Sequence, residues 1–236
     1  MKTALQIVQS ACLRMGLNKP TAALGSTDAQ VQQLVELLQE EGRELAGRYE
    51  WQALTKEASF TTVATETQGA LETIAPKCRY IVNETIWDRT LRRPVFGPLS
   101  KQAWQQLKAQ PMQGPWWQYR IRGGNIIFIP VPTAGDSCYF EYISRNWCTT
   151  ADGLTEQEDF GADDDLPLLE DNLLLHGLVW RWKAARGFEY SEDYNKYERL
   201  VNDAMARDGS KQVLNMSGTH WEIQPGIIVP TGSWNV

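Results

Sequence analysis

The chain has 236 residues, of which 42% are hydrophobic, and it carries a formal net charge of −6 at pH 7. This length and composition allow a substantial buried core, and no run approaches the roughly 18 apolar residues of a membrane span, so we expect no membrane partner. The acidic balance disfavours nonspecific DNA binding, which needs clustered Lys and Arg, but it is compatible with DNA sliding past a negatively charged wall.

Two amphipathic helices are predicted at the start of the chain. Thr3 is placed to cap the first helix and Gly16 to end it. The second helix begins near residues 26–28 and keeps apolar residues at helical spacing as far as Tyr49. On its solvent side, Glu44 and Arg48 have the spacing of a helical ion pair. We interpret residues 1–57 as the first helix pair.

A β-rich region follows over residues 58–150. Residues 59–63 and 138–143 are predicted strands. Between them, alternating residues 117–121, the turn Gly123-Gly124 and the apolar run 125–129 indicate a hairpin. The region also contains a short predicted helix that starts at Ser100, carries Trp104 and Leu107, and ends at Pro111.

A second helix pair is predicted over residues 151–209. Acidic residues 163–165 followed by Pro167 are typical of a helix start. The helix from Leu168 to Lys183 is apolar nearly all round, so we expect it at a bundle centre or between subunits. The residues we consider for a subunit interface are Leu173, Leu174, Leu178 and Trp182. The last helix runs from Ser191 to a stop at Gly209.

Residues 210–236 are predicted to form an extended partner-binding tail. Prolines and glycines exclude a helix, and beyond Lys211 the only acidic or basic side chain, His220 apart, is Glu222. A disordered linker is normally charged, so this segment needs a surface to lie on. The apolar residues available for binding a portal or a neighbouring subunit are Trp221, Ile223, Ile227, Ile228, Val229 and Trp234. The alternative is that the tail folds back over its own domain.

These elements predict a mainly α fold with inserted β structure (α+β). The two helix pairs would form an antiparallel helical bundle, residues 58–150 would form a β-rich insertion between its halves, and the tail would extend beyond it. Each short connection between two helices favours an antiparallel helix pair.

No constellation of catalytic residues stands out. The two histidines, His176 and His220, have no nucleophile pattern around them, and His176 falls inside the apolar helix. Acidic residues 163–165 lack the ligand spacing and turn glycine of an EF-hand, so helix capping is favoured over Ca²⁺ or Mg²⁺ binding. The four cysteines form no CxxC pair, which favours free thiols in a reducing compartment. We therefore expect no enzyme activity, no metal and no cofactor.

Aromatic and basic residues of the β-rich region leave two questions open. Trp116 and Trp117 could stack on a sugar or a nucleic-acid base, whereas the tryptophans at helical apolar positions are typical of a core. Arg89, Arg92 and Arg93 form a small basic patch, which would meet passing DNA or an acidic protein surface.

Five segments carry a family resemblance that extends from about Thr3 to Gly209. They are LVELLQEEGRELAGRYEWQALT, IVNETIWDRTLRRPVFGPLS, RIRGGNIIFIPVPTAGDSCYFEYISRNW, ADDDLPLLEDNLLLHGLVWRWKAARG and EDYNKYERLVNDAMARDG. In their order and extent they resemble the head-to-tail adaptor (connector) proteins of tailed bacteriophages, especially short-tailed ones.

The resemblance implies a virion structural protein of the neck or tail, assembled in the host cytoplasm. Copies would form a homo-oligomeric, typically dodecameric ring under the portal protein, and the C-terminal tail would grip that portal. The ring would extend the DNA channel, let genomic DNA pass without sequence recognition, and provide the docking surface for a tail or nozzle protein. The alternatives are another neck or tail-completion ring protein and a glycan-binding module that uses the tryptophan-rich β region.

Overall fold

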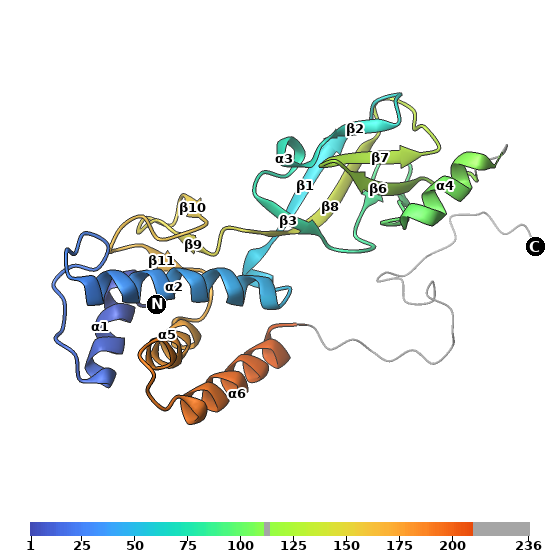
Figure 1. The fold of residues 1–236 in the computed structure, drawn as a ribbon. Coiled ribbons are helices and arrows are strands. Elements are labelled where there is room, and N and C mark those ends of the chain that lie inside the picture. The colour runs from blue at the N-terminus through green and yellow to red at the C-terminus, as the bar shows by residue number, and fades with distance from the viewer. Residues whose placement is uncertain (111–113, 210–236) are drawn as a thin grey trace, which may run out of the picture.

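The structure is a computed structural model that describes residues 1–110 and 114–209 (Figure 1). This described portion consists of a helical part, residues 1–54 and 145–209, and a β part, residues 55–110 and 114–144. The two parts lie end to end and are joined by the chain segments at the ends of strands β1 and β8 (Figure 1).

Four helices build the helical part: α1 (Ala4–Met15), α2 (Ala29–Arg48), α5 (Asp171–Ala185) and α6 (Ser191–Asp208). Local sequence explains the ends of the first two. Thr3 and Gln6 form a capping box at α1, and Gly16 closes that helix in the left-handed conformation, with φ 69°. Asp28 caps α2 by accepting a hydrogen bond from the Gln30 amide. The first two predicted helices are therefore confirmed.

Helix α5 lies at the centre of the helical part and contacts α1, α2 and α6. Its apolar residues on nearly every side explain this position, because each side meets another element. The four residues considered for a subunit interface, Leu173, Leu174, Leu178 and Trp182, are all buried in this core. They therefore pack within the subunit and do not form an exposed face.

Helix α5 begins at Asp171, several residues later than predicted. The acidic residues upstream stabilise loops instead of the helix start: the Asp163 carboxylate accepts from the amides of Ala23 and Leu24, and the Asp165 carboxylate accepts from those of Gly161 and Ala162. The predicted helix start near residues 163–165 is wrong because these carboxylates bind backbone amides outside α5.

A small sheet covers part of the helical core. It consists of β10 (Glu156–Gln157), β9 (Cys148–Thr149) and β11 (Leu166–Pro167), in that order, with both pairings antiparallel. Pro167 lies in the edge strand β11, where a residue without an amide hydrogen is tolerated.

The β part contains two further antiparallel sheets, one of five strands and one of three. The larger has β1 (Thr55–Thr61), β8 (Ser137–Ser144), β4 (Trp87–Asp88) and β5 (Arg93–Pro94) in that order, with β3 (Cys78–Ile81) also paired to β8. The smaller has the order β2 (Thr67–Ala70), β7 (Asn125–Ile129) and β6 (Gln118–Arg122). Two short helices, α3 (Leu71–Ile74) and α4 (Lys101–Ala109), and the 3-10 turn η1 (Gln52–Leu54) complete the fold.

The two larger sheets face each other across a core of their own. Phe60 of β1 makes edge-to-face contacts with Phe128 of β7 at 5.9 Å and with Phe140 of β8 at 6.2 Å, measured between ring centroids. On the other side of the small sheet, α4 places Trp104 against Ile127 and Ile129. The predicted hairpin β6–β7 and the predicted helix after Ser100 are both present.

The overall fold class predicted from the sequence is wrong. The described residues form a mixed α+β fold with three antiparallel sheets, and not a mainly helical bundle with a β insertion. The reason is that the β part holds a buried cluster of its own, with a fully buried Tyr119 and Phe128, where the two sheets pack against each other. Helical periodicity in the sequence cannot reveal this second core, because its residues come from strands that pair across long sequence separations.

Candidate functional site

The buried cysteines carry thiols of raised pKa. Burial raises the pKa of the Cys78 thiol to about 11 and the pKa values of the Cys138 and Cys148 thiols to about 12, so all three are protonated and unreactive at neutral pH. No three His, Cys, Asp or Glu residues in the described ranges are grouped to hold a metal ion. None of the helices in those ranges combines the length and apolarity of a membrane span.

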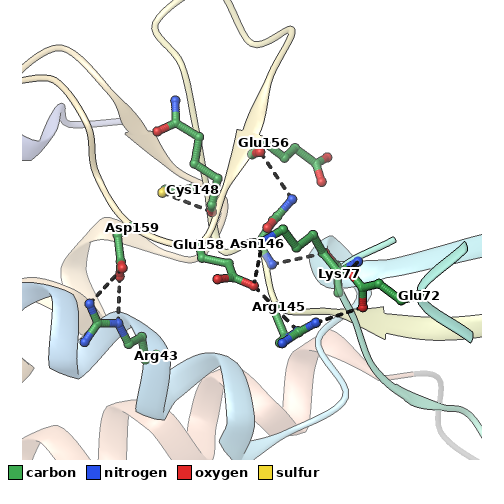
Figure 2. A network of polar contacts seen from close by, with 11 residues as sticks. Arg43, Glu72, Lys77, Arg145, Asn146, Cys148, Glu156, Glu158 and Asp159 are labelled. Carbon is green, nitrogen blue, oxygen red and sulfur yellow. Dashed lines mark hydrogen bonds and ion pairs between the residues drawn. The ribbon is translucent and has the colours of Figure 1, made fainter. Parts of the chain in front are cut away.

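A polar network connects the β part to the helical part (Figure 2). We call Glu72, Lys77, Arg145 and Glu158 the junction network. Arg145 lies 3.1 Å from the Glu72 carboxylate and 3.6 Å from that of Glu158, and the Lys77 ammonium lies 3.5 Å from Glu158 (Figure 2). The Arg145 amide also donates to the Lys77 carbonyl at 2.9 Å. This network fixes the two parts against each other at the point where the chain passes between them.

A second polar contact lies beside the junction network. Arg43 of α2 forms a two-pronged ion pair with Asp159, and both N–O distances are 2.7 Å (Figure 2). Glu158 and Asp159 thus both form ion pairs with basic side chains of the same subunit. Their arrangement favours a structural role.

A groove of about 640 Å³ runs between α2, α5 and α6. Arginines and aromatic residues share its lining, which includes Arg43, Arg48, Arg79, Arg181, Trp180, Tyr194 and Tyr197. Most of this positive charge is neutralised inside the subunit, because Arg43 pairs with Asp159 and Arg48 with Glu198. The predicted pair between Glu44 and Arg48 is absent, since each of the two residues binds a different partner across helices.

The centre of that lining is a buried arginine with three carboxylates. Arg181 donates to Glu41 at 2.6 Å and to Glu40 at 3.0 Å, and it also pairs with Glu44. Glu41 is fully buried and lies against Gly177, where any side chain would overlap the carboxylate. Sequence analysis missed this cluster, although a lone arginine in an otherwise apolar helix is a usable signal, because a buried charge needs a partner.

The predicted basic patch lies at the tip of the β4–β5 hairpin. Arg89 stacks on the Tyr139 ring, 3.6 Å from its centroid, and forms an ion pair with Glu57. Arg93 lies 5.7 Å from the centroid of Trp117. Arg92, in contrast, is exposed and makes no ion pair within the described ranges. The structure therefore brings the three arginines to one hairpin, where Arg89 and Arg92 are exposed and Arg93 is half-buried.

The two adjacent tryptophans do not form a joint stacking platform. Trp117 is 9% exposed and packs on Phe128 in the β core, whereas Trp116 is 44% exposed and contacts Phe96 edge-on. A flat sugar or base would need both rings exposed and coplanar. The predicted tail residues Trp221, Ile223, Ile227, Ile228, Val229 and Trp234 lie outside the described residues.

Comparison with known protein families gave a match over most of the chain. The model of the SU10 adaptor protein family matches residues 2–220, a stretch that includes both the helical part and the β part. A search of curated proteins gave no match. The match confirms, at the level of the family, the resemblance to adaptor proteins noted in the sequence.

Proposed function

Because this chain belongs to the SU10 adaptor protein family, we propose that it is a virion structural protein that joins the head of a tailed bacteriophage to its tail. The family match over residues 2–220 carries this proposal. The protein would reside in the virion neck, between a portal protein and a tail or nozzle protein.

In this proposal, copies of the chain form a closed ring, typically of twelve subunits, under the portal. A ring of identical subunits requires two different faces on each copy, because each contact joins unlike surfaces. The β part offers two such faces, since the outer surface of its larger sheet and that of its smaller sheet lie on opposite sides of one buried core. This architecture supports a ring.

The ring would extend the channel through which genomic DNA passes. With a net charge of −6, the subunit as a whole repels DNA, which favours sliding over binding. The exposed Arg92 at the β4–β5 tip, with Arg89 and Arg93 beside it, is the candidate contact to DNA or to an acidic partner. Such contact would be through phosphates and would carry no sequence recognition.

The C-terminal tail is the proposed portal contact. It follows α6 directly, and its six apolar residues would supply anchors, of which Trp221 and Trp234 are the largest. Tryptophans are frequent anchors in protein interfaces because they bury a large area with little rotamer freedom to lose. Ordering of such a segment on the portal would make attachment depend on the presence of that portal.

The test is the mass of the purified protein alone and mixed with the portal ring of the same virus. We expect a stoichiometric complex with the full chain, and at least about tenfold weaker binding when Trp221→Ala and Trp234→Ala are combined. Trp116→Ala, which removes an exposed tryptophan outside the tail, is the matched control and should bind normally. A full-length chain that leaves the portal unbound would contradict the adaptor function; one that binds only the tail protein would indicate a different neck component.

A further inference from the structure

The outer surface of the five-stranded sheet carries an acidic hollow of about 320 Å³. We call this surface the acidic face; its lining includes Glu57, Glu84, Trp87, Arg89, Tyr139 and Glu141. Three carboxylates and one guanidinium give the hollow an excess of negative charge. The hollow therefore suits a positively charged occupant.

Two of the glutamates lie directly opposite each other. Glu57 of β1 pairs in register with Glu141 of β8, and both side chains point away from the core. Like charges at such a position destabilise an antiparallel pair. Arg89 relieves only half of this repulsion, because it forms an ion pair with Glu57 while Glu141 has no ion pair among the described residues. A second cation between the strands would relieve the rest.

Two aromatic rings make this face suitable for an arginine or lysine side chain. Trp87 of β4 stands in register with Tyr139 of β8, and Trp87 is 42% exposed. Aromatic faces beside carboxylates attract guanidinium and ammonium groups, as the stacking of Arg89 on Tyr139 already demonstrates inside the subunit. Trp87 offers a further aromatic ring, open to solvent, beside Glu141.

The opposite side of the β part is basic. Arg120 and Arg122 of β6 alternate with Tyr119 and Ile121, which face the core, so the two arginines point to the outer side of the smaller sheet. Helix α4 covers the same side and contains no acidic residue. We call Lys101, Lys108, Arg120 and Arg122 the basic face; of these, only Lys108 forms an ion pair, with Glu66, in the part of the chain that the structure describes.

We propose that the acidic face of one copy binds the basic face of the next, with the exposed Arg122 entering the hollow beside Glu141 and Trp87. This inference rests on the proposed ring, for which it names the subunit contact. The buried core of the β part separates the two faces, so a single copy cannot bring them together. Because the two faces of a copy carry opposite charges, the acidic face of one copy can bind the basic face of the next. Such a contact between two different surfaces, repeated around an axis, forms a closed ring.

Charge reversal tests the contact. Glu141→Arg and Arg122→Glu each place like charges together, so each should weaken ring formation on the portal at least about tenfold, measured from complex mass against protein concentration. The double variant Glu141→Arg with Arg122→Glu restores opposite charges between neighbours and should return to within about twofold of the original chain. Circular dichroism would verify that every variant is folded.

Matched controls reverse exposed charges on other elements. Glu36→Arg on α2 and Arg199→Glu on α6 should leave ring formation unchanged, since both lie in the helical part. Single reversals at Glu141 and Arg122 that form normal rings would overturn the inference while leaving the adaptor function intact. Salt-sensitive DNA binding that Arg122→Glu abolishes, with ring formation unchanged, would overturn it in favour of a DNA contact.

A cross-link gives an independent measure of proximity. Glu141→Cys combined with Arg122→Cys should give covalent oligomers in the portal-bound ring after mild oxidation, because the four native cysteines are buried. Either substitution alone should give none. A portal-bound ring of the double variant without such oligomers would refute the proposed contact, and an original chain that leaves the portal unbound would refute the proposed function itself.

Discussion

Arginines of the helical part and of strand β6 in the β part differ in whether they form ion pairs within the subunit. In the helical part, Arg43, Arg48 and Arg181 each form an ion pair with a carboxylate of the same subunit. In the β part, Arg120 and Arg122 have no carboxylate partner within the described residues, while Glu57 faces Glu141. These three arginines of the helical part are neutralised within the subunit, whereas the described residues of the β part include unpaired charges of opposite sign on opposite faces.

This difference separates charges that stabilise the subunit from charges available to partners. An arginine held by three glutamates cannot leave them without a large cost, so it belongs to folding. An exposed arginine beside a strand is free to pair with another molecule at little cost. Substitutions in the helical part should therefore affect the free energy of unfolding, and charge reversals in the β part should affect assembly.

The strongest effect is expected from Arg181→Met. This change leaves Glu41 buried without its cation and should lower the free energy of unfolding by about 3–5 kcal/mol. Arg207→Met is the matched control, because Arg207 is largely exposed and lies 3.9 Å from its partner Glu170, so the loss should stay below about 0.5 kcal/mol. Urea unfolding measures both, and equal losses would contradict the distinction.

A somewhat smaller loss is expected from Gly42→Ala. Gly42 lies on α2 against the indole of the fully buried Trp147, and an added methyl group would overlap that ring. We expect a loss of about 1–3 kcal/mol in the free energy of unfolding. Gly25→Ala serves as control because its added methyl group meets open space. A Gly42→Ala protein as stable as the original would mean that Trp147 can shift.

The junction network should contribute less. Glu158→Gln removes the ion pairs to Lys77 and Arg145, but these side chains are more than one-third exposed, so solvent screening limits the loss to about 1 kcal/mol or less. The loss should shrink further at high salt. Glu36→Gln, at an exposed residue outside the network, should have no measurable effect in the same denaturation series.

The smallest expected effect is on the pH dependence of the free energy of unfolding. Burial, together with the nearby charges of Arg14 and Lys196, lowers the pKa of His176 below its ordinary value of 6.5, although Asp193 opposes this. The folded protein then binds fewer protons than the unfolded chain just below that value, so stability should fall as the pH falls through this window. His176→Gln should flatten this part of the stability-against-pH curve, and an unchanged slope would exclude His176 as its source.

Local signals in the sequence were sufficient for several elements. The capping residues Thr3 and Gly16, the apolar stripe of α2 and the Gly123-Gly124 turn each determine structure through neighbours a few positions away. Such signals need no knowledge of distant contacts. They also located α4, because Ser100 caps it directly.

The incorrect predictions depend on distant contacts. Asp163 binds amides near Ala23, about 140 positions away, and Glu41 meets Arg181 across a similar separation. Periodicity cannot reveal such pairs, so the start of α5, the small sheet and the buried ion cluster were missed. The charged faces were missed for a related reason: the positions of Glu57 and Glu141 become informative only once β1 and β8 are known to pair.

The pairing of β1 with β8 also has a consequence for the order of folding. Thr55 and Ile143 lie opposite each other, so closing this one strand pair brings the end of the first half of the helical core next to the start of the second. Pairing of β1 with β8 closes the long chain segment between them, and the entropy cost of this closure is paid at that step. Packing of α2 against α5 then requires no second closure of the same segment. During synthesis the β part can thus fold first and act as a scaffold, and the helices on either side need only search a short distance for each other.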